Sequence, residues 1–251
     1  MSGEERPPRA DIASDTTDCM RWCACAECGS REHALWRVVL AECCGAALLV
    51  LLSCLPGCGP AAAASPLHRA LAAGFVVALL VQCLDHVSGA HLNPTVTLAA
   101  LLWGKLSRTR ALAMVCAQLV GACAGGGALH LLQPGAVSNL CVTLPAQGLA
   151  AYKAALLEAV LGGCLALANC AAWDSRTAGL RDSWPLRIGV AVAGLSLVAG
   201  ELTGASMNPV RSFGPALWSR NWTSHWVYWA GPLGGSLLCT SGYMAAWRPR
   251  A

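Results

Sequence analysis

The sequence contains few charged residues. Asp, Glu, Lys and Arg together make up 12% of its 251 residues, whereas about 25% is usual in soluble domains. Hydrophobic residues reach 56%, and the mean hydropathy is +0.53. This composition argues against a soluble globular protein and favours a chain that spends most of its length inside a membrane.

Charge is nearly absent from six long apolar segments. Each approaches the roughly 20 residues that cross a bilayer core as a helix. They cover residues 35–55, 67–84, 111–132, 151–173, 184–202 and 225–246. A soluble protein with a buried helical core is the alternative, but six such segments argue against it. We therefore expect an all-α membrane protein with six transmembrane helices.

The sequence also lacks recognisable catalytic and export signals. No nucleophile–base pair or metal cluster stands out, so we expect neither an enzyme nor a cofactor or metal, and no nucleic acid as a partner. The polar start, with Glu4, Glu5 and Pro7, does not read as a cleavable signal peptide. We expect the first span to insert the chain into the membrane.

The few Lys and Arg residues occur in alternate connecting segments. Arg31 precedes the first span, Lys105 follows the second, Arg181 follows the fourth and Arg248 follows the sixth. Loops rich in Lys and Arg stay in the cytoplasm. This pattern predicts a multi-pass protein of the cell membrane with both termini cytoplasmic.

Fifteen cysteines are many for such a chain. Most lie inside the predicted spans, where a thiol packs as a small hydrophobic group. A cluster in the predicted cytoplasmic tail, residues 1–32, consists of Cys19, Cys23, Cys25 and Cys28. Metal binding, palmitoylation and an unmodified, disordered tail are alternatives for this cluster, and we favour the last.

A short pattern occurs twice, 115 positions apart: "GAHLNP" from Gly89 and "GASMNP" from Gly204. The duplication extends further, since Glu42 in the first span and Glu158 in the fourth are 116 apart. Each copy thus contains three spans and one loop. Because three is odd, the second copy must enter the membrane from the opposite side. Inverted repeats of this kind place their site at the membrane midplane, on discontinuous helices.

The Asn-Pro pairs are typical of helix starts. Asn93 and Asn208 are good N-cap residues, and Pro94 and Pro209 suit the first helical position. About ten helix-compatible residues follow each pair, which is half the length of a span. We therefore expect two re-entrant half-helices whose N-termini meet at the centre. Their positive dipole ends and the asparagine amides would repel cations and donate hydrogen bonds to passing oxygen atoms.

These motifs resemble the aquaporins, or major intrinsic proteins. The resemblance rests on the two Asn-Pro boxes, "RSFGPA" after the second box, "AE" in the first span, Glu158, and "YWAGPLGG" in the sixth. It covers about residues 33–248, with repeat one at 33–132 and repeat two at 150–248; residues 249–251 form a short cytoplasmic end. Thr95 and Val210 replace the alanine that usually completes each box, which raises the question of packing at the centre.

The resemblance implies a homotetramer in the lipid bilayer, with one pore per subunit and passive flow in both directions. Glu42 and Glu158 would be buried and brace the carbonyls of the half-helix loops. A carboxylate inside a span is costly without such a partner. A snorkelling or protonated glutamate at the surface is the alternative.

Counting from the Asn-Pro boxes places the four residues of the family's outer constriction at Ala73, Ser196, Ala205 and Arg211. Water-selective relatives carry a phenylalanine and a histidine in place of the first two. Small residues there predict a wider opening, unless a neighbour such as Phe75 fills it. Pore width and lining donors then favour glycerol, urea and water as solutes.

Other residues follow the water-channel pattern instead. Ser212 follows Arg211, where common glycerol channels carry aspartate. The combination resembles the entomoglyceroporins, a water-channel branch with an opened constriction. A water-selective aquaporin with a repacked constriction and a closed-pore adhesion member are the alternatives.

Three further residues are singled out. His91 and Val192 are expected to line the pore, in which Arg211 is the single expected charge. Asn221 begins an Asn-Trp-Thr glycosylation sequon in a loop that the topology makes extracellular.

Overall fold

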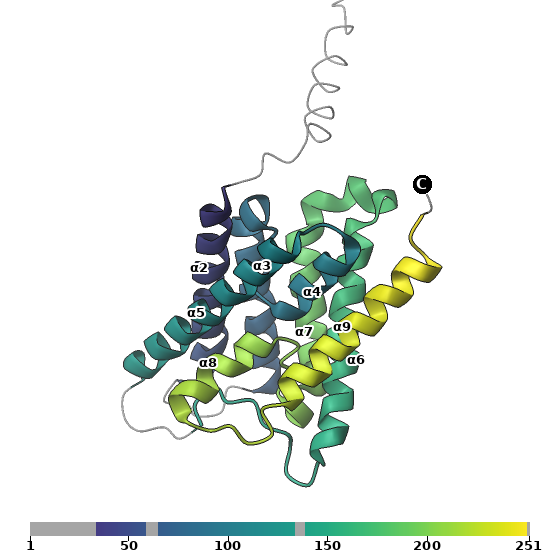
Figure 1. Cartoon of the computed structure of the whole chain (residues 1–251). Helices are drawn as coiled ribbons and strands as arrows, with labels where there is room; N and C mark the ends of the chain where they lie inside the picture. The colour runs from purple at the N-terminus through teal and green to yellow at the C-terminus, as the bar shows by residue number, and fades with distance from the viewer. Residues whose placement is uncertain (1–33, 59–64, 134–138, 250–251) are drawn as a thin grey trace, which may run out of the picture. The chain divides into compact units, whose positions relative to one another are not determined.

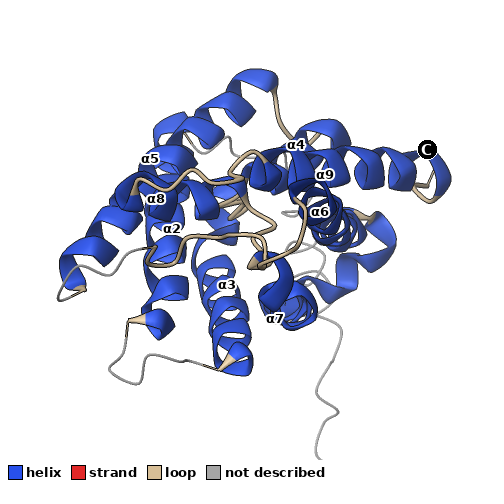
Figure 2. Ribbon diagram, turned by 90° about the horizontal axis from the view of Figure 1, so that it is seen from below, coloured by secondary structure: helices blue, strands red, loops and turns tan. Residues whose placement is uncertain are grey.

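The computed structural model describes residues 34–58, 65–133 and 139–249. The four cysteines of the N-terminal tail, Cys19, Cys23, Cys25 and Cys28, lie outside these residues. Figure 2 shows the described part as helices joined by loops, without a β-strand. The expected all-α fold is therefore confirmed.

Eight α-helices and two 3-10 helices follow one another along the described residues. They are α2 (Leu35–Cys54), η1 (Leu55–Gly57), α3 (Pro66–Ser88), α4 (Pro94–Trp103), α5 (Arg108–Leu132), α6 (Ala151–Trp173), η2 (Ser175–Ser183), α7 (Trp184–Thr203), α8 (Pro209–Ser219) and α9 (Val227–Ala246). The two short helices, α4 and α8, begin at the prolines of the Asn-Pro pairs and lie between the long ones (Figure 1). The expected re-entrant half-helices are thus present.

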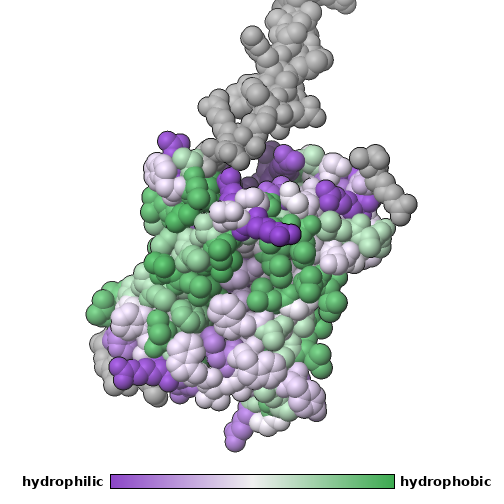
Figure 3. Space-filling view, in the orientation of Figure 1, coloured by the Kyte–Doolittle hydropathy of each residue, from purple (hydrophilic) through white to green (hydrophobic). Residues whose placement is uncertain are grey.

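Five of the six long helices are long and apolar enough to cross a membrane, among the residues described. The sixth, α9, has 20 residues but is rich in Gly, Ser and Thr, which lowers its hydropathy. α3 extends to Ser88, four residues beyond the predicted span. Figure 3 shows a hydrophobic band across the middle of one face, with hydrophilic residues toward both ends. This pattern suits a bilayer core flanked by polar interfaces.

The two repeats pack their helices in the same way. α2 packs on α5 in the first repeat, and α6 packs on α9 in the second. In the first pair, a Cβ added at Gly121 would collide with the carbonyl oxygen of Cys43; in the second, one at Gly235 would collide with that of Ala159. Small residues let the backbones of membrane helices approach this closely. Glycine at both equivalent positions therefore sets the spacing inside each repeat.

α3 and α7 join the two repeats through a symmetric contact. A Cβ at Gly74 would collide with the carbonyl oxygen of Gly189, and one at Gly189 would lie 2.6 Å from the carbonyl oxygen of Gly74. The half-helices also cross over: α8 packs on α5, and α4 packs on α9. Each repeat thus holds the half-helix of the other.

The glycine contacts generate a prediction. Gly235→Ala should lower the free energy of unfolding by about 1–3 kcal/mol, because overpacking forces the backbones apart. Gly234→Ala is the matched control, since nothing lies within 4 Å of a Cβ added there. Thermal unfolding of the purified variants in one detergent measures both. Equal stability of the two variants would contradict the close approach of α6 and α9.

Candidate functional site

A cavity of about 410 Å³ runs between the two repeats. α3 and α7 each contribute a stripe of residues four apart, the spacing that places side chains on one helix face. The stripes are Arg69, Ala73, Val77 and Val81 on α3, and Ile188, Val192, Ser196 and Gly200 on α7. The loops before the half-helices also line the cavity, together with residues of α2, α6 and the segment before α6.

Those two loops share an uncommon backbone conformation. Ala90 and Leu92 have φ angles of 43° and 51°, and their equivalents Ala205 and Met207 have 41° and 54°. A left-handed conformation of this kind costs about 1–3 kcal/mol for a residue other than glycine, and it persists only where its surroundings hold it. The question is what holds these loops.

Glu42 holds the first loop. Its side chain is fully buried and accepts hydrogen bonds from the backbone N–H groups of His91, at 3.0 Å, and Leu92, at 2.7 Å. The Ser88 hydroxyl, at 2.6 Å, and the Gln118 amide, at 2.7 Å, also donate to it. Four donors thus converge on one carboxyl group, two on each of its oxygen atoms.

Glu158 holds the second loop in the same way. It accepts from the N–H groups of Ser206, at 2.9 Å, and Met207, at 2.8 Å, and from the Thr203 hydroxyl, at 2.7 Å. Both carboxylates therefore bind loop N–H groups, and the expectation that they brace the loop carbonyls was wrong. The physical reason is that a carboxylate only accepts hydrogen bonds, and a carbonyl has none to donate.

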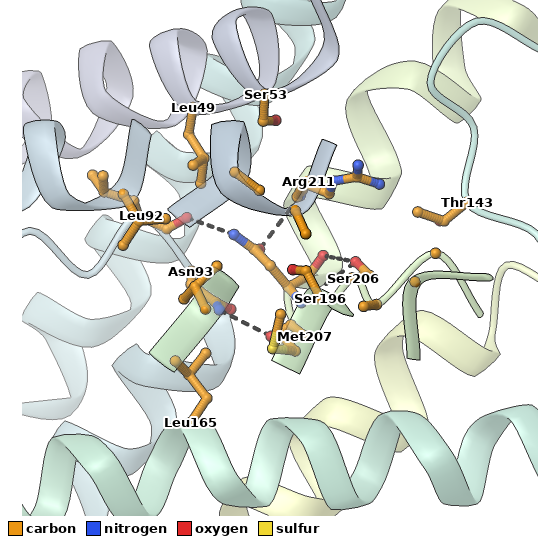
Figure 4. A pocket seen from close by; sticks show the side chains of 18 of the residues that line it. Leu49, Ser53, Leu92, Asn93, Thr143, Leu165, Ser196, Ser206, Met207 and Arg211 are labelled. Atoms are coloured by element: carbon orange, nitrogen blue, oxygen red, sulfur yellow. Dashed lines mark hydrogen bonds between the residues drawn. The ribbon is translucent and has the colours of Figure 1, made fainter. Parts of the chain in front are cut away.

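The two asparagines tie the loops together at the centre. Asn93 Nδ2 donates to the carbonyl oxygen of Met207, and Asn208 Nδ2 donates to that of Leu92, each at 2.9 Å. Figure 4 shows both contacts as dashed lines. The Oδ1 atoms cap the half-helices, accepting from the N–H groups of Thr95, at 2.8 Å, and of Val210, at 3.0 Å. Each amide keeps a second N–H, and both asparagines line the cavity.

The structure brings all four predicted constriction residues to the cavity wall: Ala73, Ser196, Ala205 and Arg211. His91 and Val192 also line it. Phe75 does not, and its side chain is 61% exposed on the outside of the bundle. Phe75 therefore leaves the space beside Ala73 open.

Thr95 and Val210 lie outside the cavity wall. Both are fully buried, and Val210 packs in a hydrophobic cluster with Val50 and Ala122. Pro94 and Pro209, which precede them, are buried at the first position of each half-helix. The unusual residues of the two boxes thus alter the packing between helices and leave the pore wall unchanged.

Two charges in the cavity wall were missed from the sequence. Arg69 and Glu201 line it together with Arg211, so the expectation of a single charge was wrong. The signal was available for Arg69, which precedes Ala73 by four residues and so shares its helix face. Glu201 likewise follows Leu197, another lining residue, by four.

A disulfide that the sequence did not reveal closes one side of the cavity. It joins Cys54, at the end of α2, to Cys141 in the segment before α6, with their Cα atoms 5.5 Å apart. Both cysteines line the cavity, and Arg211 Nη2 lies 3.8 Å from Cys141 Sγ. A bond from Thr143 Oγ1 to Ser212 Oγ, 2.7 Å long, holds the same segment. The disulfide therefore fixes the chain that faces Arg211.

Asn221 contacts that segment as well. Its Nδ2 donates to Asn139 Oδ1 at 2.6 Å, and its Oδ1 accepts from the Thr223 N–H at 3.0 Å. Nδ2 is also the atom that would carry a glycan. Glycosylation at this sequon would therefore compete with the hydrogen bond to Asn139.

The two threonines of α4 generate a matched prediction. Thr95 Oγ1 is buried and has no hydrogen-bond partner among the described residues. Thr97 Oγ1, in contrast, bonds to Asn93 O at 3.1 Å and to Gln118 Nε2 at 3.0 Å. Thr95→Val should therefore keep or raise the stability, and Thr97→Val should lower it by about 1–3 kcal/mol. Thermal unfolding in detergent compares them. A larger loss for Thr95→Val would contradict this assignment.

The disulfide generates a second prediction. Removing it in the double variant Cys54→Ala/Cys141→Ala should lower the stability by about 2–4 kcal/mol, because the unfolded chain gains freedom. A reductant should lower the unfolding temperature of the parent protein and leave that of the double variant unchanged. Cys58→Ala, which removes a neighbouring free thiol, is the control. A reductant effect that persists in the double variant would refute the pairing.

Comparison with known proteins gives consistent matches. The family description "Major intrinsic protein" matches residues 29–243. The lens fiber major intrinsic protein of Gallus gallus is 42% identical over 229 residues, covering 88% of this chain and 85% of that protein. Aquaporin-4 of Homo sapiens is 36% identical over 247 residues, covering 92% and 76%.

A solved structure shows the same fold. The X-ray structure of the aquaglyceroporin from Plasmodium falciparum matches with a TM-score of 0.77 at 21% identity, over 85% of this chain and 97% of that one. The family match spans most of the chain, and the fold agrees with it. The chain therefore belongs to the major intrinsic protein family, whose members are membrane channels for water or small solutes and not enzymes.

Proposed function

We propose that this channel conducts glycerol, urea and other small uncharged solutes as well as water. The observation that carries the proposal is the composition of the cavity wall around Arg211. Ala73, Ser196 and Ala205 line it there, and Phe75 lies outside. The aromatic rings on the wall, His91 and Trp184, come from the opposite end of the cavity, where α7 begins. Pore diameter and lining groups decide which solutes pass.

The wall combines the polar and apolar groups that a polyol needs. Its polar part includes the second N–H of each central asparagine, the Ser196 hydroxyl and the Arg211 guanidinium, which donate to hydroxyl or carbonyl oxygens. Its apolar part comprises Leu49, Val77, Val96, Leu165 and Val192. The hydroxyl groups of glycerol can accept hydrogen bonds from these donors, and its carbon atoms can contact the apolar side chains. A few polar groups in an apolar wall are typical of sites for small molecules.

The residue after Arg211 supports an opened water-channel type, similar to the entomoglyceroporins. Ser212 is fully buried, and its hydroxyl contacts those of Thr143 at 2.7 Å and Ser206 at 2.6 Å. An aspartate there would replace one of three hydroxyl groups that satisfy one another with a buried charge. The solute range therefore depends on the constriction residues and needs no change after the arginine.

We propose a homotetramer in the cell membrane, with both termini cytoplasmic. The positions of Lys105, Arg181 and Arg248 support this orientation, because Lys105 follows α4, Arg181 lies in η2 and Arg248 follows α9, on one side of the bundle. The disulfide of Cys54 would then lie on the extracellular, oxidising side. The exposed apolar side chains of the long helices would face lipid or neighbouring subunits.

Restoring bulk at the constriction tests the proposed solute range. In proteoliposomes, Ala73→Phe/Ser196→His should lower glycerol and urea permeability by about tenfold or more, equivalent to at least about 1.4 kcal/mol of added barrier. Water permeability should remain, because a water-sized opening is left beside Arg211. Stopped-flow light scattering measures all three solutes.

Phe75→Ala is the matched control, since it changes an aromatic residue on the same helix outside the cavity. It should leave each permeability unchanged. Water flow without glycerol flow in the parent protein would establish a water-selective channel instead. Absence of both water flow and glycerol flow in the parent protein would favour a closed-pore member of the family.

A further inference from the structure

A second cavity, of about 270 Å³, lies at the end of the pore where α7 begins. We call it the inner cavity. Gly89, His91 and Trp184 line both the inner cavity and the pore. A molecule held in the inner cavity would therefore lie against the mouth of the pore.

Cationic side chains from three elements meet on the wall of the inner cavity. Lys105 follows α4, Arg181 belongs to η2, and Arg187 lies in the first turn of α7. Asp85, near the end of α3, is the acidic residue on this wall. Three cations thus face one carboxylate.

These cations form no ion pair within the described part of the chain, although Asp85 lies on the same wall. The ion pair found there joins Arg176 to Asp174, and neither guanidinium of the inner cavity makes a hydrogen bond among the described residues. Lys105 Nζ lies 5.8 Å from the centre of the Trp173 ring. Burial and the charge of Arg181 both lower the pKa of Lys105, and Asp85 only partly offsets them. Among the described residues, the cations on this wall therefore outnumber its one carboxylate, Asp85.

The start of α7 adds to this field. α7 has 20 residues, and its N-cap, Ser183, makes no side-chain capping bond. η2 runs directly into α7: the Trp184 N–H donates to the carbonyl oxygen of Arg181, and Pro185 has no N–H, so this helix end favours an anion through the helix dipole. Arg181 and Arg187 lie on either side of this helix start. A planar guanidinium binds phosphate with two parallel hydrogen bonds.

We propose that the inner cavity is a binding site for a phosphate-bearing anion, and that its occupancy obstructs the pore. The phosphate could belong to a small cytosolic molecule or to the headgroup of a lipid in the adjoining leaflet. Both present the same group to Lys105, Arg181 and Arg187. The proposal does not depend on which solutes the channel carries, so water permeability is a sufficient flux readout.

Calorimetry on the full-length protein in detergent tests binding first, with pyrophosphate as the probe. Saturable binding is expected, and Arg181→Gln/Arg187→Gln should weaken it by about tenfold or more, a loss of about 1.4 kcal/mol. Arg220→Gln is the control, because Arg220 caps α8 and lines neither cavity. Absence of binding to the parent protein, or equal binding to the double variant, would overturn the site. This readout needs no flux, so it stands apart from the proposed solute range.

Water permeability of proteoliposomes tests the obstruction and separates the two sources. One set of proteoliposomes contains phosphatidylcholine alone and is measured with and without pyrophosphate on both sides of the membrane. A second set contains added phosphatidylinositol bisphosphate and is measured without pyrophosphate. A fall in permeability with pyrophosphate supports a soluble ligand, and a fall with the lipid alone supports a headgroup. Either effect should vanish in Arg181→Gln/Arg187→Gln and persist in Arg220→Gln. Unchanged permeability in both sets would overturn the obstruction.

Discussion

The rest of this channel depends on the hydrogen bonds that the buried carboxylates of Glu42 and Glu158 accept from two loops. A bilayer core offers no water to backbone N–H groups, so irregular chain at that depth must be satisfied by the protein or a polar cavity. Each carboxylate accepts two N–H groups of the loop that precedes a half-helix. That bonding holds alanine, leucine and methionine residues at positive φ angles, where only firm surroundings keep them. Without these acceptors, neither loop could return the chain to the centre.

The loops in turn bring the half-helices together. Each Asn-Pro pair caps one half-helix and bonds to the loop of the other repeat, so the centre is joined by two equivalent contacts. The two halves differ where the pore opens beside Arg211. There the second copy carries an arginine at the position of Val96, and a disulfide-linked segment faces it. The two equivalent contacts therefore form the centre of the path, and the two repeats differ at the end beside Arg211.

Much of the fold could be predicted from the sequence, because its signals are local. Apolar length predicted the spans, and the Asn-Pro pairs predicted the half-helices to within about a residue. Counting from those pairs also placed Ala73 and Ser196 on the wall, since helical spacing fixes which face a residue occupies. The expectation that the two buried glutamates brace loop carbonyls was wrong, because sequence spacing does not show which group of a loop a carboxylate contacts. Arg69 and Glu201 were missed because the count from the Asn-Pro pairs was applied only to the four positions of the constriction.

By itself, then, the sequence determined the class of protein, its duplication, and the residues available to each helix face. Those properties follow from composition and periodicity along the chain, which need no knowledge of distant neighbours. Only the tertiary structure decided that Thr95 and Val210 face the core, that Cys54 pairs with Cys141, and that the cations of the inner cavity meet. Each depends on which faces of remote helices pack together. "GASMNP" predicted a capped half-helix, but its bond to Leu92, 116 residues away, exists because both loops reach the same point.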